Sequence, residues 1–254
     1  MSCSNVVRRT ISAKINYFSI FIWLMFYTAI GFLFVLLACK SPKSGKYVIS
    51  YSMTDYPTVV IDAGHGGFDG GAVSESGILE KNINLDISQR LALLFELSDI
   101  PCVLTRTDDN ELVSSYNGSK SRKRGDLMAR AEICESFENA IFISIHQNKF
   151  PSSKYSGLQV FYSRNNKDSE ILAKSIREVN CSLIDSSNMR ECKPAGSEIY
   201  LLDRIEAPAV LVECGFLSNR LEAEKLSDKN YQNKLAVMLY SAITSYIFRE
   251  NSVM

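Results

Sequence analysis

The strongest constraint on the fold is a pair of apolar segments that each lead to a histidine. Residues 58–62 have the composition of a buried strand and run into the glycine-rich turn that contains His65, and residues 140–145 lead directly to His146. These are the only two histidines in the chain. The carboxyl ends of parallel strands meet at one edge of an open α/β sheet, where such folds bind ligands. The sequence therefore predicts a metal site at that edge.

Other apolar segments alternate with amphipathic ones. Strands are also predicted at 101–105, 157–162, 199–202 and 208–214, and helices at 78–97, from Asp126 onward, at 172–183 and at 235–246. The turn-rich stretch 108–125 is predicted to be a mobile loop, and residues 182–197 are predicted to be irregular. This alternation indicates one α/β domain with a mostly parallel, twisted sheet of about six strands flanked by helices.

An uncharged apolar run covers residues 15–39, after Arg8, Arg9 and Lys14. A signal-peptide core has about 7–15 residues, whereas a membrane-spanning helix needs about 20. The predicted organisation is a cytoplasmic segment at 1–14, a transmembrane anchor or signal sequence at 15–39, a linker at 40–56, a folded domain at 57–248 and a tail at 249–254. Residues 36–39 also resemble a bacterial lipoprotein cleavage site, with Cys39 as the lipidated residue. Both interpretations place the folded domain on the extracytoplasmic side.

The charges and cysteines exclude some functions. Lysine and arginine together number 28, as do aspartate and glutamate, so no nucleic-acid partner is expected. The basic residues at 120–124 are interpreted as a solvated loop, or alternatively as a patch that steers an anionic polymer. Without a Cys-x-x-Cys pair, a thiolate zinc site is disfavoured. The spacing leaves open whether Cys181 and Cys192 form a disulfide.

Glu80 is a candidate third ligand. It lies at the start of the predicted helix 78–97, which returns close to the carboxyl edge of the first strand. A catalytic zinc usually has three protein ligands with nitrogen or oxygen donors and one water. The alternative is that Glu80 only interacts favourably with the helix dipole. Two histidines and one carboxylate would also suit ferrous iron, although that chemistry usually occupies a β-rich barrel.

Glu213 is a candidate acid–base residue. It directly follows the apolar run 209–212 near the end of the predicted strand 208–214, where an unpaired buried charge is costly. A carboxylate near a metal-bound water can accept its proton and later donate it to a leaving group. The alternative is an ion pair with Arg106 or Arg130. Asp62 is interpreted as a residue that orients a ligand or a backbone group without binding metal.

Four ordered segments carry a family resemblance. They are VVIDAGHGG at 59–67, EKNINL at 80–85, SIHQN at 144–148 and PAVLVECGFLSN at 208–219. In this order they resemble the signature segments of the zinc-dependent N-acetylmuramoyl-L-alanine amidases, over residues 57–248. The resemblance implies that His65, Glu80 and His146 bind Zn²⁺, that Glu213 is catalytic, and that the enzyme cleaves the amide between the lactyl group of N-acetylmuramic acid and L-alanine in peptidoglycan.

Residues 144–151 and 155–163 are most similar to the germination-specific branch of that family. Its members trim peptides from spore cortex peptidoglycan on the way to muramic-δ-lactam, which implies a location in the forespore intermembrane space. Because no wall-binding module is found, we expect dependence on the anchor or on a separate partner, such as a lipoprotein. Cys134-Glu135 departs from the Ala-Asn of many members, which affects packing more than chemistry. A different interpretation is a peptidoglycan-binding scaffold whose metal is structural.

Overall fold

The computed structural model describes Met25 and residues 56–112 and 119–251. The strands are β1 (Thr58–Ala63), β2 (Cys102–Leu104), β3 (Ala140–Asn148), β4 (Gln159–Tyr162), β5 (Lys193–Pro194) and β6 (Ala209–Phe216). The helices are α2 (Glu80–Glu96), α3 (Ser119–Glu135), α4 (Asp168–Leu183), α5 (Tyr200–Arg204), α6 (Arg220–Ser227) and α7 (Lys229–Asn251). The predicted class, one α/β domain with a six-stranded sheet, is confirmed.

The sheet has the order β2-β1-β3-β6-β4-β5. All neighbouring strands are parallel except β4, which runs antiparallel to β6. The adjacent central strands β1, β3 and β6 therefore end at the same edge. This arrangement places the residues that follow β1 beside the end of β3.

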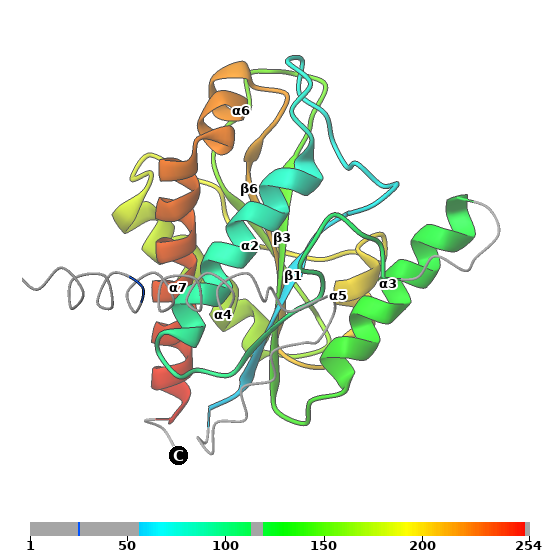
Figure 1. The fold of residues 1–254 in the computed structure, drawn as a ribbon. Coiled ribbons are helices and arrows are strands. Elements are labelled where there is room, and N and C mark those ends of the chain that lie inside the picture. Colours follow the sequence, from blue (N-terminus) through cyan, green and yellow to red (C-terminus); the bar gives the residue numbers. More distant parts are fainter. Residues whose placement is uncertain (1–24, 26–55, 113–118, 252–254) are drawn as a thin grey trace, which may run out of the picture. The chain divides into compact units, whose positions relative to one another are not determined.

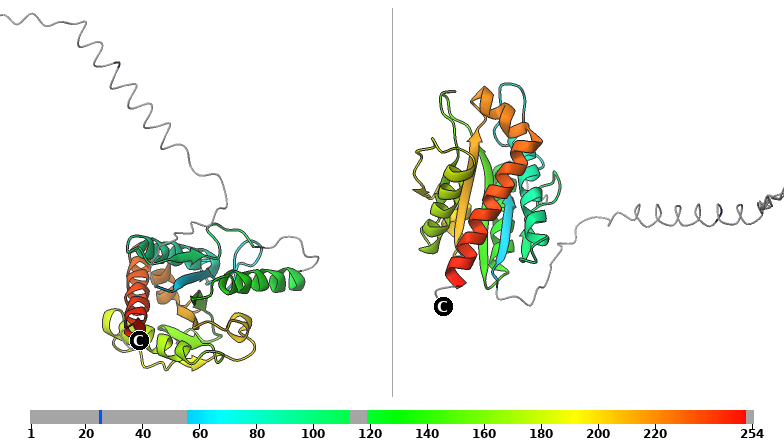
Figure 2. Two further views of the ribbon diagram at one scale, coloured as in Figure 1. Left: turned by 90° about the horizontal axis from the view of Figure 1, so that it is seen from below. Right: turned by 90° about the vertical axis from the view of Figure 1, so that its left-hand side faces the viewer.

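Helices cover both faces of the sheet (Figures 1 and 2). Alternate strand residues such as Val59 and Ile61 belong to the core that α2, α4 and α7 cover, whereas Val60 and Phe142 belong to the core beneath α3 and α5. A strand buried on both faces has a continuous apolar sequence rather than an alternating one. This double burial explains the uninterrupted apolar run of β1.

Three predictions about local structure are wrong. Residues 199–202 do not form a strand, because helix α5 begins at Tyr200 and the edge strand is β5; a short apolar run cannot distinguish the two structures. The predicted loop 108–125 ends early, because α3 already begins at Ser119 and its lysines and arginines are good helix formers. Asp126 therefore lies inside α3 and does not cap it. Helix α6 was not predicted.

The remaining predictions concern a disulfide, a membrane-spanning helix and the segments outside the folded domain. Cys181 and Cys192 are both free thiols in the structure. No helix in the described part of the chain is long and apolar enough to span a membrane. Apart from Met25, the predicted anchor at 15–39 lies outside the described residues, as do most of the linker 40–56 and part of the tail.

Candidate metal centre

His65 lies in a tight turn directly after β1. Its φ is 63°, and those of Gly66 and Gly67 are 134° and 55°, so three successive residues have positive φ. A side chain larger than hydrogen is strained in this region, which explains the glycines after His65. The turn brings the imidazole back over the end of the sheet.

Glu80 is the first residue of α2 and is only 3% exposed. Its Oε2 accepts a hydrogen bond from the backbone N–H of Ala72 at 2.7 Å, and its Oε1 accepts one from that of Gln147 at 3.0 Å. These bonds fix the carboxylate between the glycine-rich turn and β3. A favourable interaction with the helix dipole does not require such contacts, so Glu80 has more than that one role.

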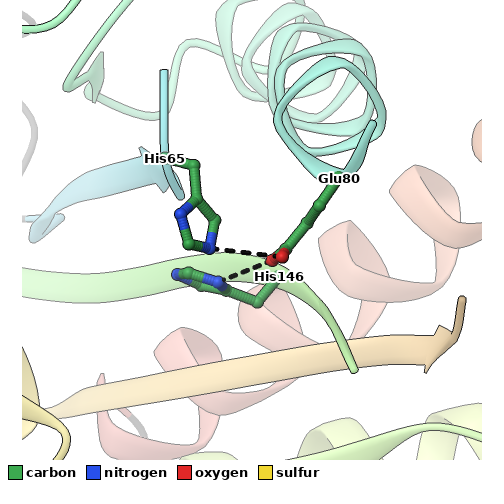
Figure 3. A group of neighbouring side chains, drawn as sticks. All are labelled: His65, Glu80 and His146. Atoms are coloured by element: carbon green, nitrogen blue, oxygen red, sulfur yellow. Dashed lines mark hydrogen bonds and ion pairs between the residues drawn. The ribbon is translucent and has the colours of Figure 1, made fainter. Parts of the chain in front are cut away.

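The two imidazoles converge on this carboxylate (Figure 3). His65 Nε2 lies 3.2 Å from Glu80 Oε2, and His146 Nδ1 lies 2.9 Å from Glu80 Oε1. One ligand atom from each of the three side chains lies within 4.8 Å of the others. The structure thus brings together all three residues predicted as ligands.

The surroundings of this cluster fit a small cation. A Cβ on Gly71 would lie 2.6 Å from Glu80 Oε2 and 2.7 Å from the His65 ring, and a Cβ on Gly64 would lie 2.2 Å from His146 Nε2. Glycine at both positions lets the backbone approach the ligands closely. Two nitrogens and one carboxylate oxygen are the donor set of a catalytic zinc.

Asp69 contacts the cluster and was not predicted from the sequence. Its Oδ2 lies 3.0 Å from His65 Nδ1, the ring nitrogen that does not face Glu80, and 2.9 Å from Lys123 Nζ. A carboxylate on the second nitrogen orients a metal-binding histidine and increases its basicity. The four-residue spacing from His65 is the only sequence signal for this pair.

Electrostatics hold the cluster in a charged form. Burial disfavours charge on His65, but hydrogen bonds to Asp69 and Glu80 outweigh it and raise the pKa of His65 to about 9. Burial would raise the pKa of Glu80, but its hydrogen bonds with His146 and His65 lower that pKa far below its usual range. Without metal, His65 is therefore an imidazolium beside an ionised Glu80 at neutral pH.

Glu213 lies on β6, in register with His146 on the neighbouring β3. With His65 and His146 it lines a cavity of about 270 Å³ beside the cluster of His65, Glu80 and His146. Its Oε2 is buried and has no hydrogen-bond partner among the described residues. Burial raises the pKa of Glu213 to about 7. An acid with a pKa near neutrality can both accept and donate a proton during turnover.

Arg106 and Arg130 do not pair with Glu213, so that alternative is wrong. Arg130 Nη1 donates to Asp62 Oδ1 at 2.6 Å, and both arginines donate to backbone carbonyls of the His65 turn. Asp62 also accepts hydrogen bonds from Thr105 and Ser144. Asp62 was predicted to orient a ligand or a backbone group, but its carboxylate bonds to side chains. It acts on the backbone of the turn through Arg130, which donates to the carbonyls of Ala63 and His65.

The basic segment 120–124 belongs to helix α3 and is not a loop, although Lys123 and Arg124 are exposed to solvent as predicted. Arg122 forms an ion pair with Glu111, and its guanidinium lies 4.4 Å from the centre of the Phe68 ring. Lys123 lines the same cavity as Glu213 and contacts Asp69. This helix therefore lines the site, as do Glu198, just before α5, and Tyr200, the first residue of α5.

Comparison with known proteins assigns the family. The family model described as N-acetylmuramoyl-L-alanine amidase matches residues 59–245. The germination-specific N-acetylmuramoyl-L-alanine amidase of Bacillus subtilis is 33% identical over 229 residues, which cover 88% of this chain and 94% of that protein. The amidase LytC of the same organism is 30% identical, over 74% of this chain and 35% of its own length.

Solved structures agree with this assignment. The CwlD amidase from Clostridioides difficile, in complex with the GerS lipoprotein, is 40% identical with a TM-score of 0.73, over 76% of this chain and 98% of that one. The amidase AmiC2 of Nostoc punctiforme is 31% identical with a TM-score of 0.64, over 76% of this chain and 97% of that one. The chain therefore belongs to the N-acetylmuramoyl-L-alanine amidase family and is an enzyme of that kind, acting on peptidoglycan.

Proposed function

We propose that the chain is a zinc-dependent hydrolase of the amide between the lactyl group of N-acetylmuramic acid and L-alanine. His65, Glu80 and His146 would hold the zinc, and Glu213 would act as the general base and acid. The observation that carries this proposal is the convergence of three nitrogen and oxygen donors within 4.8 Å of one another. The cavity beside them, which contains a buried carboxylate without a hydrogen-bond partner among the described residues, supports the role of Glu213.

In the proposed reaction zinc would activate a water molecule, and Glu213 would transfer the protons. When bound, zinc lowers the pKa of a coordinated water toward ~7 and polarises the scissile carbonyl. The carboxylate of Glu213 accepts a proton from the attacking water, and the water oxygen bonds to the lactyl carbonyl carbon. The carbon–nitrogen bond then breaks as Glu213 donates the proton to the alanine nitrogen. The products are a glycan carboxylate and a peptide with a free amino group.

Asp69 and Lys123 would support this reaction indirectly. Asp69 holds His65 Nδ1, so that Nε2 stays directed at the metal position. Lys123 shares the same carboxylate oxygen and lies at the wall of the cavity.

The test is mass analysis of peptidoglycan fragments after treatment with purified protein. Wild type should release peptides with a new N-terminal alanine and leave lactyl carboxylates on the glycan. Glu213→Gln should lose about 10²–10⁴-fold of the rate, which is the usual contribution of general acid–base catalysis. Glu178→Gln, the same chemical change at an exposed position on α4, is the control. Fragments with new reducing glycan ends, or full turnover by Glu213→Gln with zinc bound, would contradict the proposal.

The biological substrate we propose is spore cortex peptidoglycan, trimmed on the way to muramic-δ-lactam. The relative from Bacillus subtilis is named germination-specific, and the similar amidase from Clostridioides difficile was solved with a lipoprotein. The first relative supports a role in germination, and the second supports a lipoprotein partner. Muramic-δ-lactam should be missing from the cortex of a strain that carries Glu213→Gln.

The proposed location is the extracytoplasmic face of a membrane, in the forespore intermembrane space. Residues 15–39 would anchor the catalytic domain at 57–248 through the linker 40–56, or Cys39 would carry a lipid. The uncharged run at 15–39 supports this proposal. Residues 50–254 should be less active on intact cortex than the full chain with its partner. Equal activity of the two would show that neither the anchor nor the partner is needed.

A further inference from the structure

The backbone around His65 carries an energetic cost before any ligand binds. His65 is one of two non-glycine residues with positive φ in the described part of the chain, and it lies in the left-handed region at 63°. Such a conformation persists only where surrounding contacts hold it, and it is often found at functional sites. The contacts that hold His65 are therefore part of the site.

Three successive carbonyls in this turn accept hydrogen bonds from buried side chains. Ala63 O accepts from Arg106 Nε and from Arg130 Nη1, both at 2.8 Å. Gly64 O accepts from Asn84 Nδ2 at 3.0 Å and from Arg106 Nη2 at 3.2 Å. His65 O accepts from Arg130 Nη2 at 2.7 Å. Ala63 is the last residue of β1, and Gly64 and His65 follow it, so these side chains bond to the backbone where the strand ends.

Arg106 also connects two of the proposed ligands. Its Nη2 donates both to Gly64 O and to Lys81 O, the latter at 2.8 Å. Gly64 precedes His65 and Lys81 follows Glu80, so a single guanidinium nitrogen ties the backbone of one ligand to that of the other. A lysine ammonium has no planar fork and cannot reproduce this set of bonds.

Both arginines are nearly inaccessible, with exposed fractions of 3% for Arg106 and 1% for Arg130. Arg130 is compensated by Asp62 and Asp126. Arg106 has no ion pair with a carboxylate among the described residues, and its Nε, Nη1 and Nη2 donate to backbone carbonyls. Burial of this guanidinium is costly, and its hydrogen bonds to the carbonyls of the turn and of Lys81 offset that cost.

We propose that Arg106 and Arg130 are positioning residues that hold His65 against Glu80 before the metal binds. The two guanidiniums fix the backbone on both sides of His65, and Arg106 sets its separation from the start of α2. The arginines do not touch the metal or the substrate. This inference rests on the proposed metal site, and it adds that the affinity of the site for zinc depends on the two arginines.

The test compares Arg106→Lys and Arg130→Lys with wild type as full-length proteins. Each variant keeps the charge but loses hydrogen bonds to the turn. Zinc affinity is measured by competition with a chelator, and we expect it to fall about 10–100-fold, as it does when partners of metal ligands are removed. Arg106→Gln is a second variant that retains an N–H donor without the cost of a buried charge, and we expect the same direction of change.

Ile243→Val is the control for a general loss of stability. Ile243 is fully buried on α7. It belongs to the core that α2, α4 and α7 cover. This variant should lower the unfolding midpoint while zinc affinity stays at the wild-type value. If the arginine variants bind zinc as tightly as Ile243→Val, the proposed positioning role is refuted. If wild type itself binds no zinc, the proposed function fails instead.

A second measurement reports on His65 directly. The chain has only two histidines, so ¹⁵N-histidine labelling gives two imidazole spectra, which His65→Gln would assign. In metal-free Arg130→Lys and Arg106→Lys we expect the His65 ring nitrogens to shift or broaden, while the resonances of His146 change little. Unchanged His65 resonances in both variants would overturn the inference even if their stability had fallen.

Discussion

Replacing Glu213 with glutamine should stabilise the metal-free protein, although the same change should slow turnover by the factor given above. Burial raises the pKa of Glu213 from the ordinary 4.5 to about 7. The folded state therefore holds this proton more tightly than the unfolded state, and stability falls as the pH rises through this interval. At ~1.36 kcal/mol per pKa unit, the ionised carboxylate costs the folded protein at most about 3 kcal/mol above pH 7. Glutamine has nearly the same shape and carries no charge.

The assay is urea unfolding of both proteins after removal of metal, at several pH values. Below about pH 4.5 the carboxyl is protonated in both states, so the two proteins should differ little. Between about pH 4.5 and 7 the variant should become progressively more stable, and above pH 7 the difference should level off at no more than about 3 kcal/mol. Glu178→Gln, at an exposed position, should show no such pH dependence.

A glutamine variant that is equally or less stable than wild type at pH 8 would refute this reasoning. The same would follow if the difference did not change between pH 4 and 8. The variant is expected to be more stable and less active than wild type. The site therefore keeps the carboxyl group of Glu213 for catalysis although the folded state would be more stable without it.

Four other predictions follow from the site. The imidazole of His65 in metal-free protein should titrate with a midpoint near 9 by NMR, so its stabilising contacts are fully present below pH 6.5 and are lost as the pH rises through 9. Because zinc must displace that proton, zinc affinity measured against a chelator should fall about tenfold per pH unit below 9. Gly64→Ala should lose zinc and amidase activity, because its Cβ would lie 2.2 Å from His146 Nε2; a variant that retains both would contradict the assignment. Asp62→Asn should lower the free energy of unfolding by about 3 kcal/mol, the low end for a broken buried ion pair, since Asp126 still pairs with Arg130; a change below about 1 kcal/mol in urea unfolding would contradict this.

The ends of the central strands could be predicted because apolar runs and the following histidines lie close together in sequence. β1 and β3 are covered on both faces, so their composition alone identified them. Glu80 could be predicted because the helix that follows a strand and its connecting loop returns close to the end of that strand. These are local signals, and the structure brings the three side chains together as expected.

The residues that support the site could not be predicted in this way. Arg106 and Arg130 were considered only as partners for Glu213, since sequence cannot show which side chains donate to the backbone carbonyls at the end of β1 and just after it. Asp69 contacts His65 only because three successive residues adopt positive φ. α5 was mistaken for a strand because four apolar residues suit either structure. Each error concerns contacts or conformations that depend on the folded chain.

The central claim is that one zinc ion is held by two imidazoles and a carboxylate. X-ray absorption at the zinc edge of the purified full-length enzyme tests it most directly. We predict imidazole nitrogens at about 2.0–2.1 Å together with oxygen ligands, and loss of one imidazole contribution in His146→Ala. Sulfur ligands at about 2.3 Å, or an absorption spectrum that His65→Ala and His146→Ala both leave unchanged, would contradict it.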